Sequence, residues 1–123
     1  MKLRIRGDSL RIRLSQSEVA TFAERGALED STSFGLSGTL TYAMAFGDSI
    51  GATLTGARIL VTIPAAAARA WATNEEVGLE AAQSTGEGTL KILVEKDFAC
   101  LTPRGEEDAD AFPHPKEATG ESC

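Results

Sequence analysis

Hydrophobic and polar residues alternate in several stretches of the chain, and this alternation predicts a mainly β protein. Residues 2–6 (KLRIR) and 10–14 (LRIRL) are two such runs, separated by Gly7-Asp8-Ser9. Successive side chains of a strand point to opposite faces, so the two runs predict a β-hairpin with one apolar and one cationic face. The apolar face would carry Leu3, Ile5, Leu10, Ile12 and Leu14.

A short helix is predicted directly after this hairpin. Ser15 and Glu18 have the spacing of a capping box, in which each residue's side chain accepts a hydrogen bond from the other's backbone N–H. Val19, Phe22 and Ala23 would form the buried stripe of the helix. Gly26 follows at the position where glycine commonly ends a helix.

The rest of the pattern predicts six further strands and a second helix. Alternating runs place strands at 39–46, 50–54 and 58–63, and residues 77–81 and 89–95 are also assigned to strands. Residues 27–31 are a candidate short strand. Pro64 stops the run at 58–63, and an alanine-rich segment continues to about Ala72. Proline suits the first turn of a helix, where its missing N–H would have no partner, so a short helix begins here.

The two halves of the chain show the same order of predicted elements. A shift of 49 residues places Gly7 on Gly56 and Phe22 on Trp71. Such self-similarity is typical of a structural repeat, although two generic ββα units could also coincide. We expect an α+β, mainly β fold: duplicated ββαββ halves (2–46 and 50–96) form one pseudo-twofold barrel or sandwich, and a short helix from each half covers an open end.

Charge and composition divide the chain into two parts. Residues 1–104 hold 11 Lys/Arg and 12 Asp/Glu, a net charge of −1, whereas residues 105–123 hold one Lys and six acids, a net charge of −5. We therefore predict a single globular domain over 1–101 and an acidic, flexible tail over 102–123. No run approaches the roughly 20 apolar residues of a membrane span, and the start lacks the apolar core of a signal peptide. A cytoplasmic protein without membrane contact is the expectation.

The second half resembles one subunit of the swapped-hairpin regulators of the AbrB and MazE type. The matching residues are the strand and turn Val61-Thr62-Ile63-Pro64, the helix to Trp71, and the strands Val77–Ala81 and Thr89–Glu95. The resemblance implies a fused pseudo-dimer that binds DNA through cations of its first hairpin. Antitoxin members of that family also carry acidic tails that hold a toxin.

A second resemblance covers nearly the whole length. The opening KLRIRGDSLRIRLS and the later segments Val94–Leu101 and Phe112–Lys116 resemble a family of small uncharacterised bacterial proteins. This resemblance implies no activity and no cofactor.

The cationic face of the first hairpin is the sharpest candidate site. Its residues are Lys2, Arg4, Arg6, Arg11 and Arg13. Such a row could neutralise phosphates or another anion. It could equally be a solvated face paired with nearby acids, since opposed like charges weaken a hairpin, or a dock for the chain's own acidic tail. The second hairpin carries only Arg58, which argues against a symmetric DNA clamp.

No motif in the chain indicates catalysis. His114 lies between two prolines, and His114, Cys100 and Cys123 lack the spacing of a metal site. Phosphate-loop and nucleophile-turn motifs are absent, and we expect Trp71 and Phe22 to pack in the core. We predict a non-enzymatic binding or interaction protein without cofactor, catalytic residue or metal. An unknown protein partner is the first hypothesis, and nucleic-acid binding through the first hairpin is the alternative.

Overall fold

A computed structural model describes residues 1–98 of the chain. In chain order its elements are β1 (Lys2–Ile5), β2 (Ser9–Leu14), α1 (Gln16–Arg25), β3 (Ala27–Ser33), a short 3-10 turn (Gly35–Ser37), β4 (Thr39–Phe46), β5 (Gly51–Thr55), β6 (Arg58–Ile63), α2 (Ala65–Thr73), β7 (Gly78–Ser84) and β8 (Thr89–Lys96). The predicted order of strands and helices is confirmed, with β3 and β7 longer than expected. No helix among these residues is long and apolar enough to cross a membrane.

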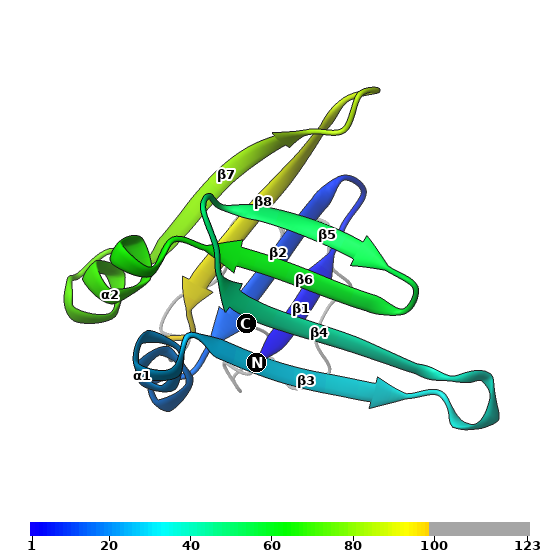
Figure 1. The fold of residues 1–123 in the computed structure, drawn as a ribbon, viewed down its shortest axis with the longest axis horizontal. Helices are drawn as coiled ribbons and strands as arrows, with labels where there is room; N and C mark the ends of the chain where they lie inside the picture. Colours follow the sequence, from blue (N-terminus) through cyan, green and yellow to red (C-terminus); the bar gives the residue numbers. More distant parts are fainter. Residues whose placement is uncertain (99–123) are drawn as a thin grey trace, which may run out of the picture.

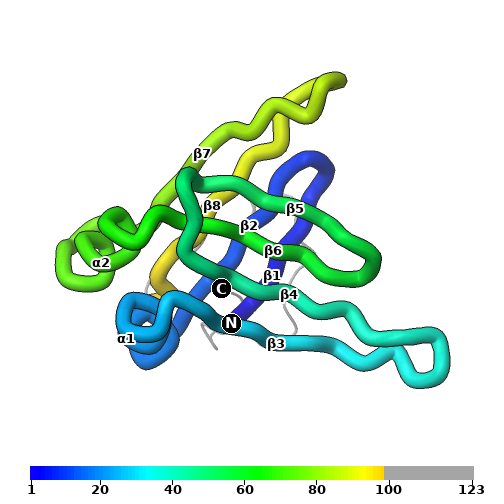
Figure 2. Tube along the Cα trace, in the orientation of Figure 1, coloured from blue at the N-terminus to red at the C-terminus, as the bar shows by residue number. Residues whose placement is uncertain are grey.

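The strands form two four-stranded sheets. The first sheet has the order β1-β2-β8-β7 and the second has the order β3-β4-β6-β5 (Figure 1). Each sheet therefore takes one hairpin from each half of the chain, and the two hairpins meet in a parallel pair, β2 with β8 or β4 with β6. Figure 2 shows the first and last hairpins running together behind the two middle hairpins. The α+β, mainly β prediction is confirmed, as two sheets and not a closed barrel.

The central strands follow the alternation of the sequence. In β2, Leu10, Ile12 and Leu14 are buried, and the residues between them are partly exposed. In β6, every second residue from Ile59 to Ile63 is likewise buried. One face of each sheet thus supplies apolar side chains to a common core, as the period of two requires.

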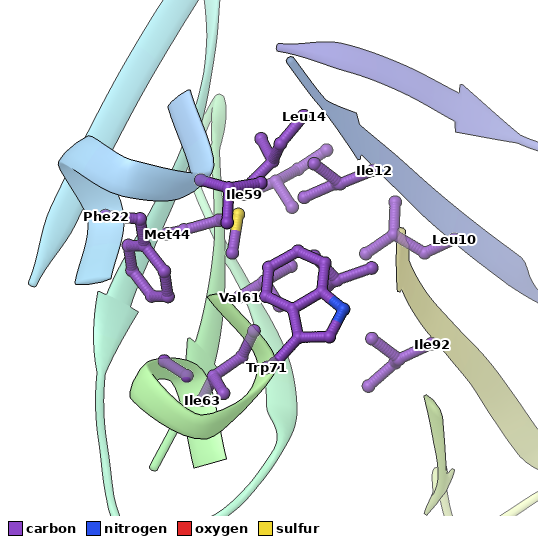
Figure 3. Packing of buried hydrophobic residues seen from close by; sticks show 13 residues of the cluster. Leu10, Ile12, Leu14, Phe22, Met44, Ile59, Val61, Ile63, Trp71 and Ile92 are labelled. Atoms are coloured by element: carbon purple, nitrogen blue, oxygen red, sulfur yellow. The ribbon is translucent and has the colours of Figure 1, made fainter. Parts of the chain in front are cut away.

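Two aromatic side chains from the helices fill the core between the sheets. Trp71 on α2 is 1% exposed and Phe22 on α1 is fully buried, so their predicted packing role is confirmed. Trp71 projects into the cluster between Leu10 and Ile92 on one side and Val61 on the other (Figure 3). The two helices lie together at the same end of the molecule (Figure 1).

The ends of α1 have the geometry that the sequence predicts. The Glu18 backbone N–H donates to Ser15 Oγ at 3.3 Å, and the Ser15 N–H donates to Glu18 Oε1 at 2.8 Å. Gly26 has a φ of 75° at the C-cap, and a Cβ there would lie 2.7 Å from the Phe46 ring. A left-handed conformation and a close neighbour both favour glycine at this position.

Replacing Ser15 by alanine should weaken the start of α1. Ser15→Ala removes one side of the capping box, and we expect a loss of about 1 kcal/mol in the free energy of unfolding. Urea denaturation followed by circular dichroism measures this loss. Ser17→Ala removes a neighbouring hydroxyl that caps no backbone N–H, and its expected change is below about 0.5 kcal/mol. Equal effects of the two substitutions would contradict the cap assignment.

Two expectations about apolar residues are wrong. Ile5 was assigned to the buried face of the first hairpin, but it is 58% exposed because it lies near the end of an edge strand. The apolar residues Phe98, Cys100 and Leu101 after the last strand also predict a buried exit from that strand, but Phe98 is 61% exposed, two residues beyond the last paired position. Cys100, Leu101 and the predicted tail at 102–123 lie outside the described residues.

Candidate anion-binding face

The five predicted cations lie together on the outer face of the first sheet. In the register of β1 and β2, Arg4 lies opposite Arg11 and Lys2 lies opposite Arg13. Arg6 follows at the start of the turn, where it exchanges two backbone hydrogen bonds with Ser9. We call this surface the cationic face.

A carboxylate from β8 pairs with two of these cations. Arg13 lies beside Glu95 in the parallel β2–β8 pair, and Arg13 Nε donates to Glu95 Oε1 at 2.6 Å. Arg11 Nε lies 3.6 Å from the same oxygen. The Glu95 side chain is only 14% exposed, so water screens these ion pairs less than it screens pairs on an open surface. Part of the cationic face is therefore neutralised within the chain.

A second carboxylate lies where β8 ends. Lys2 Nζ is 2.8 Å from Asp97 Oδ2. The hydrogen bond from Lys2 lowers the pKa of Asp97, and it outweighs partial desolvation, which raises that pKa. Asp97 is thus charged at neutral pH, and the chain leaves the first sheet close to the beginning of β1.

The other end of the face holds a pocket of about 400 Å³. Its lining residues are Arg4, Ile5, Arg6, Ser9 and Arg11. Among residues 1–98, no carboxylate belongs to this lining, and none forms an ion pair with Arg6. Guanidinium groups offer planar sets of N–H donors that match carboxylate or phosphate oxygens. The pocket therefore has the chemistry of an anion site.

An apolar groove of about 250 Å³ adjoins this pocket. The pocket and the groove share Ile5 and Ser9 as lining residues, and the groove extends to Leu54 in β5. Ile5 and Leu54 are 58% and 70% exposed, so the groove offers apolar surface to a ligand. The remaining lining residues are Leu10, Ala52, Thr53, Ile59 and Leu90. A ligand that contacts both hollows would meet cations at one end and apolar side chains at the other.

Besides Asp97, sequence reasoning missed three further charged residues on the same face. Lys91, Glu80 and Glu95 come from β7 and β8, more than 60 positions beyond the first hairpin. The parallel pairing of β2 with β8 puts Arg13 beside Glu95, and the antiparallel pairing of β7 with β8 puts Glu80 across from Leu93. The only available signal was the general expectation that acids must lie near five clustered cations.

Within residues 1–98, no three metal-ligating side chains of the His, Cys, Asp and Glu types gather. His114, Cys100 and Cys123 lie outside that range. The buried Trp71 Nε1 has no hydrogen-bond partner there, and Lys96 Nζ lies 5.6 Å from the centroid of the Trp71 ring.

Comparison with known proteins identifies a family but no activity. No curated protein matches the chain significantly, and no solved structure does so either. The proposed likeness to the AbrB and MazE regulators therefore stays a prediction. The model of a family of unknown function (DUF7009) matches residues 1–116, which confirms the expected membership of an uncharacterised family. The chain belongs to this family of unknown function.

Proposed function

We propose that this protein is a non-enzymatic binding protein that holds an acidic segment of a partner protein on its cationic face. The observation that carries the proposal is the pocket lined by Arg4, Arg6 and Arg11 beside an apolar groove. Acidic side chains would enter the pocket, and a neighbouring apolar side chain would cover Ile5 and Leu54. The lack of any catalytic motif in the sequence supports a binding role.

The position of β1 supports a peptide ligand. β1 is an edge strand of the first sheet, so one side of its backbone lacks a neighbouring strand among residues 1–98. An extended peptide can add to such an edge through main-chain hydrogen bonds, and its alternate side chains then supply specificity. Arg4 and Ile5 are consecutive in β1, so a bound peptide would meet a cationic and an apolar surface on its two faces.

Nucleic-acid binding is the second candidate, and the row of five cations supports it. Two features weigh against it. Glu95 pairs with Arg11 and Arg13, which lowers the charge available to phosphates. On the second sheet, Arg58 pairs with Glu29. The second hairpin therefore lacks a row of cations that could bind a DNA duplex symmetrically with the first hairpin. Phosphate backbones also offer nothing for the apolar groove to contact.

A titration can separate these two candidates. The full chain is mixed with a labelled peptide of about 12 residues, in which acidic and apolar residues alternate, or with a DNA duplex of about 20 base pairs, at about 50 mM salt. We expect peptide binding that Arg6→Ala combined with Arg11→Ala weakens at least about tenfold, as the loss of charge-assisted hydrogen bonds predicts.

The matched control is Arg25→Ala combined with Arg58→Ala, which removes two positive charges away from the cationic face. We expect it to leave the peptide affinity within about twofold, because neither arginine lines the pocket or the groove. Absence of peptide binding, or equal loss in both double variants, would overturn the proposal. Tighter binding of the duplex, with affinity falling steeply as salt rises, would establish the nucleic-acid candidate instead.

A further inference from the structure

Among residues 1–98, no strand pairs with the outer edge of β1, which carries defined hydrogen-bonding groups. Arg6 and Ser9 exchange two backbone hydrogen bonds, at 3.0 and 3.1 Å. Hydrogen-bonded and non-hydrogen-bonded pairs alternate along an antiparallel ladder, so the N–H and C=O groups of Leu3 and Ile5 point away from β2. No side chain among residues 1–98 bonds to these groups. An open edge of this kind favours the addition of another strand.

The corresponding edge of the second sheet is closed by a side chain. Gln83 in β7 binds both backbone groups of Ala52 in β5: Ala52 N–H donates to Gln83 Oε1 at 2.8 Å, and Gln83 Nε2 donates to Ala52 O at 2.9 Å. The equivalent position in the first half is Thr32, which lies across from Leu40 as Gln83 lies across from Leu90. Threonine is too short for the same bridge. The backbone groups on the outer edge of β1 therefore cannot be bonded by a side chain at this position, as those of β5 are.

The chain itself carries a segment whose pattern matches this edge. In residues 106–112 (EEDADAF), acids stand at Glu106, Asp108 and Asp110 with alanine at positions 109 and 111. On an extended strand these three acids share one face. The cations of the first hairpin show the same spacing, because Lys2, Arg4 and Arg6 are also two residues apart.

The exit of β8 brings this segment within reach. Asp97 pairs with Lys2, so the chain leaves the first sheet near the start of β1. The eight residue steps from Phe98 to Glu106 can span up to about 26–29 Å. The outer side of β1 lies three strand spacings from β8, about 14 Å. From there the segment would run parallel to β1 and end at the apolar groove, where Pro113 prevents further pairing.

We propose that residues 106–112 add to β1 as a fifth strand of the first sheet. The acids at 106, 108 and 110 lie along the cationic face. Glu107, at the start of the strand, shares the opposite face with Ala109 and Ala111, on the side of Leu3 and Ile5. Where the proposed function holds, this segment competes with an acidic partner for the same surface. The strand addition itself does not depend on any partner.

Amide hydrogen exchange of the full chain tests this proposal. We expect the Leu3 and Ile5 amides to exchange slowly in the natural sequence. They should exchange about tenfold faster in the triple variant Glu106→Gln, Asp108→Asn and Asp110→Asn, which loses three exposed ion pairs. The control triple variant Glu76→Gln, Glu117→Gln and Glu121→Gln removes the same charge at positions outside residues 106–112, and it should keep the slow exchange.

The other outcomes would overturn the strand addition. Unchanged exchange in the first triple variant means that the acids do not hold the segment on β1. Equal acceleration in both variants indicates a general charge effect. Protection that rises with protein concentration indicates that a second copy covers β1. If exchange responds as proposed but no acidic peptide binds even to the first triple variant, the strand addition stands and the proposed function fails.

Discussion

Trp71→Ala is expected to lower the free energy of unfolding by about 3–5 kcal/mol, the largest loss from any single substitution proposed for this chain. Trp71 is 1% exposed and is the largest fully buried side chain of the core. Its removal would leave a cavity between the two sheets, lined by residues such as Leu10 and Ile92 (Figure 3). Small domains are stable by only about 5–15 kcal/mol, so the variant would be close to unfolding at room temperature.

Trp71→Phe provides the graded control for this prediction. Phenylalanine keeps an aromatic ring in the core and removes the indole N–H, which has no hydrogen-bond partner among residues 1–98. We expect a clearly smaller loss than for alanine, because part of the volume is retained and a buried donor is removed. Since Trp71 is the only tryptophan, unfolding should be followed by far-ultraviolet circular dichroism. A loss below about 1 kcal/mol for Trp71→Ala would show that Trp71 is not a core residue.

Glu95→Gln is expected to have two opposite effects. The substitution removes the charge that accepts the 2.6 Å hydrogen bond from Arg13, so the free energy of unfolding should fall by about 1.5–3 kcal/mol. It also frees Arg11 and Arg13 from their common partner. The cationic face should then bind an acidic peptide several-fold more tightly, because the electrostatic attraction increases.

Glu80→Gln is the matched control for this substitution. Glu80 lies on the same face of the first sheet, is exposed, and forms no ion pair among residues 1–98. Glu80→Gln removes the same formal charge as Glu95→Gln, and we expect it to change the free energy of unfolding by less than about 0.5 kcal/mol. Urea denaturation and the peptide titration together measure both effects. Identical results for the two variants would mean that the Arg11–Glu95–Arg13 cluster has no special energetic role.

The local elements could be predicted because each depends on residues that are close in sequence. The capping box of Ser15 and Glu18 and the alternation in residues 10–14 are local signals, and both appear in the structure as expected. The burial of Ile5 could not be predicted in the same way. Its place in the alternation is right, but exposure depends on whether another strand covers that edge.

The candidate site was predictable in part. The five cations share one face because a strand has a period of two, and the sequence contains that period. Their neutralisation by Glu95 depends on the pairing of β2 with β8, which joins Arg13 to a residue 82 positions away. The pocket and the groove also require the second sheet, because Leu54 belongs to β5.

By itself, the sequence determined the order of strands and helices, the capping box of α1, and the buried side of the central strands β2 and β6, since these follow from local periodicity and hydrogen-bonding chemistry. Only the tertiary structure decided that each sheet combines hairpins from both halves. It also decided that the cationic face receives Glu95 and Asp97, and that β1 is an edge strand of the first sheet among residues 1–98. Strand partners are chosen by the burial of the whole core, and no local pattern specifies that choice.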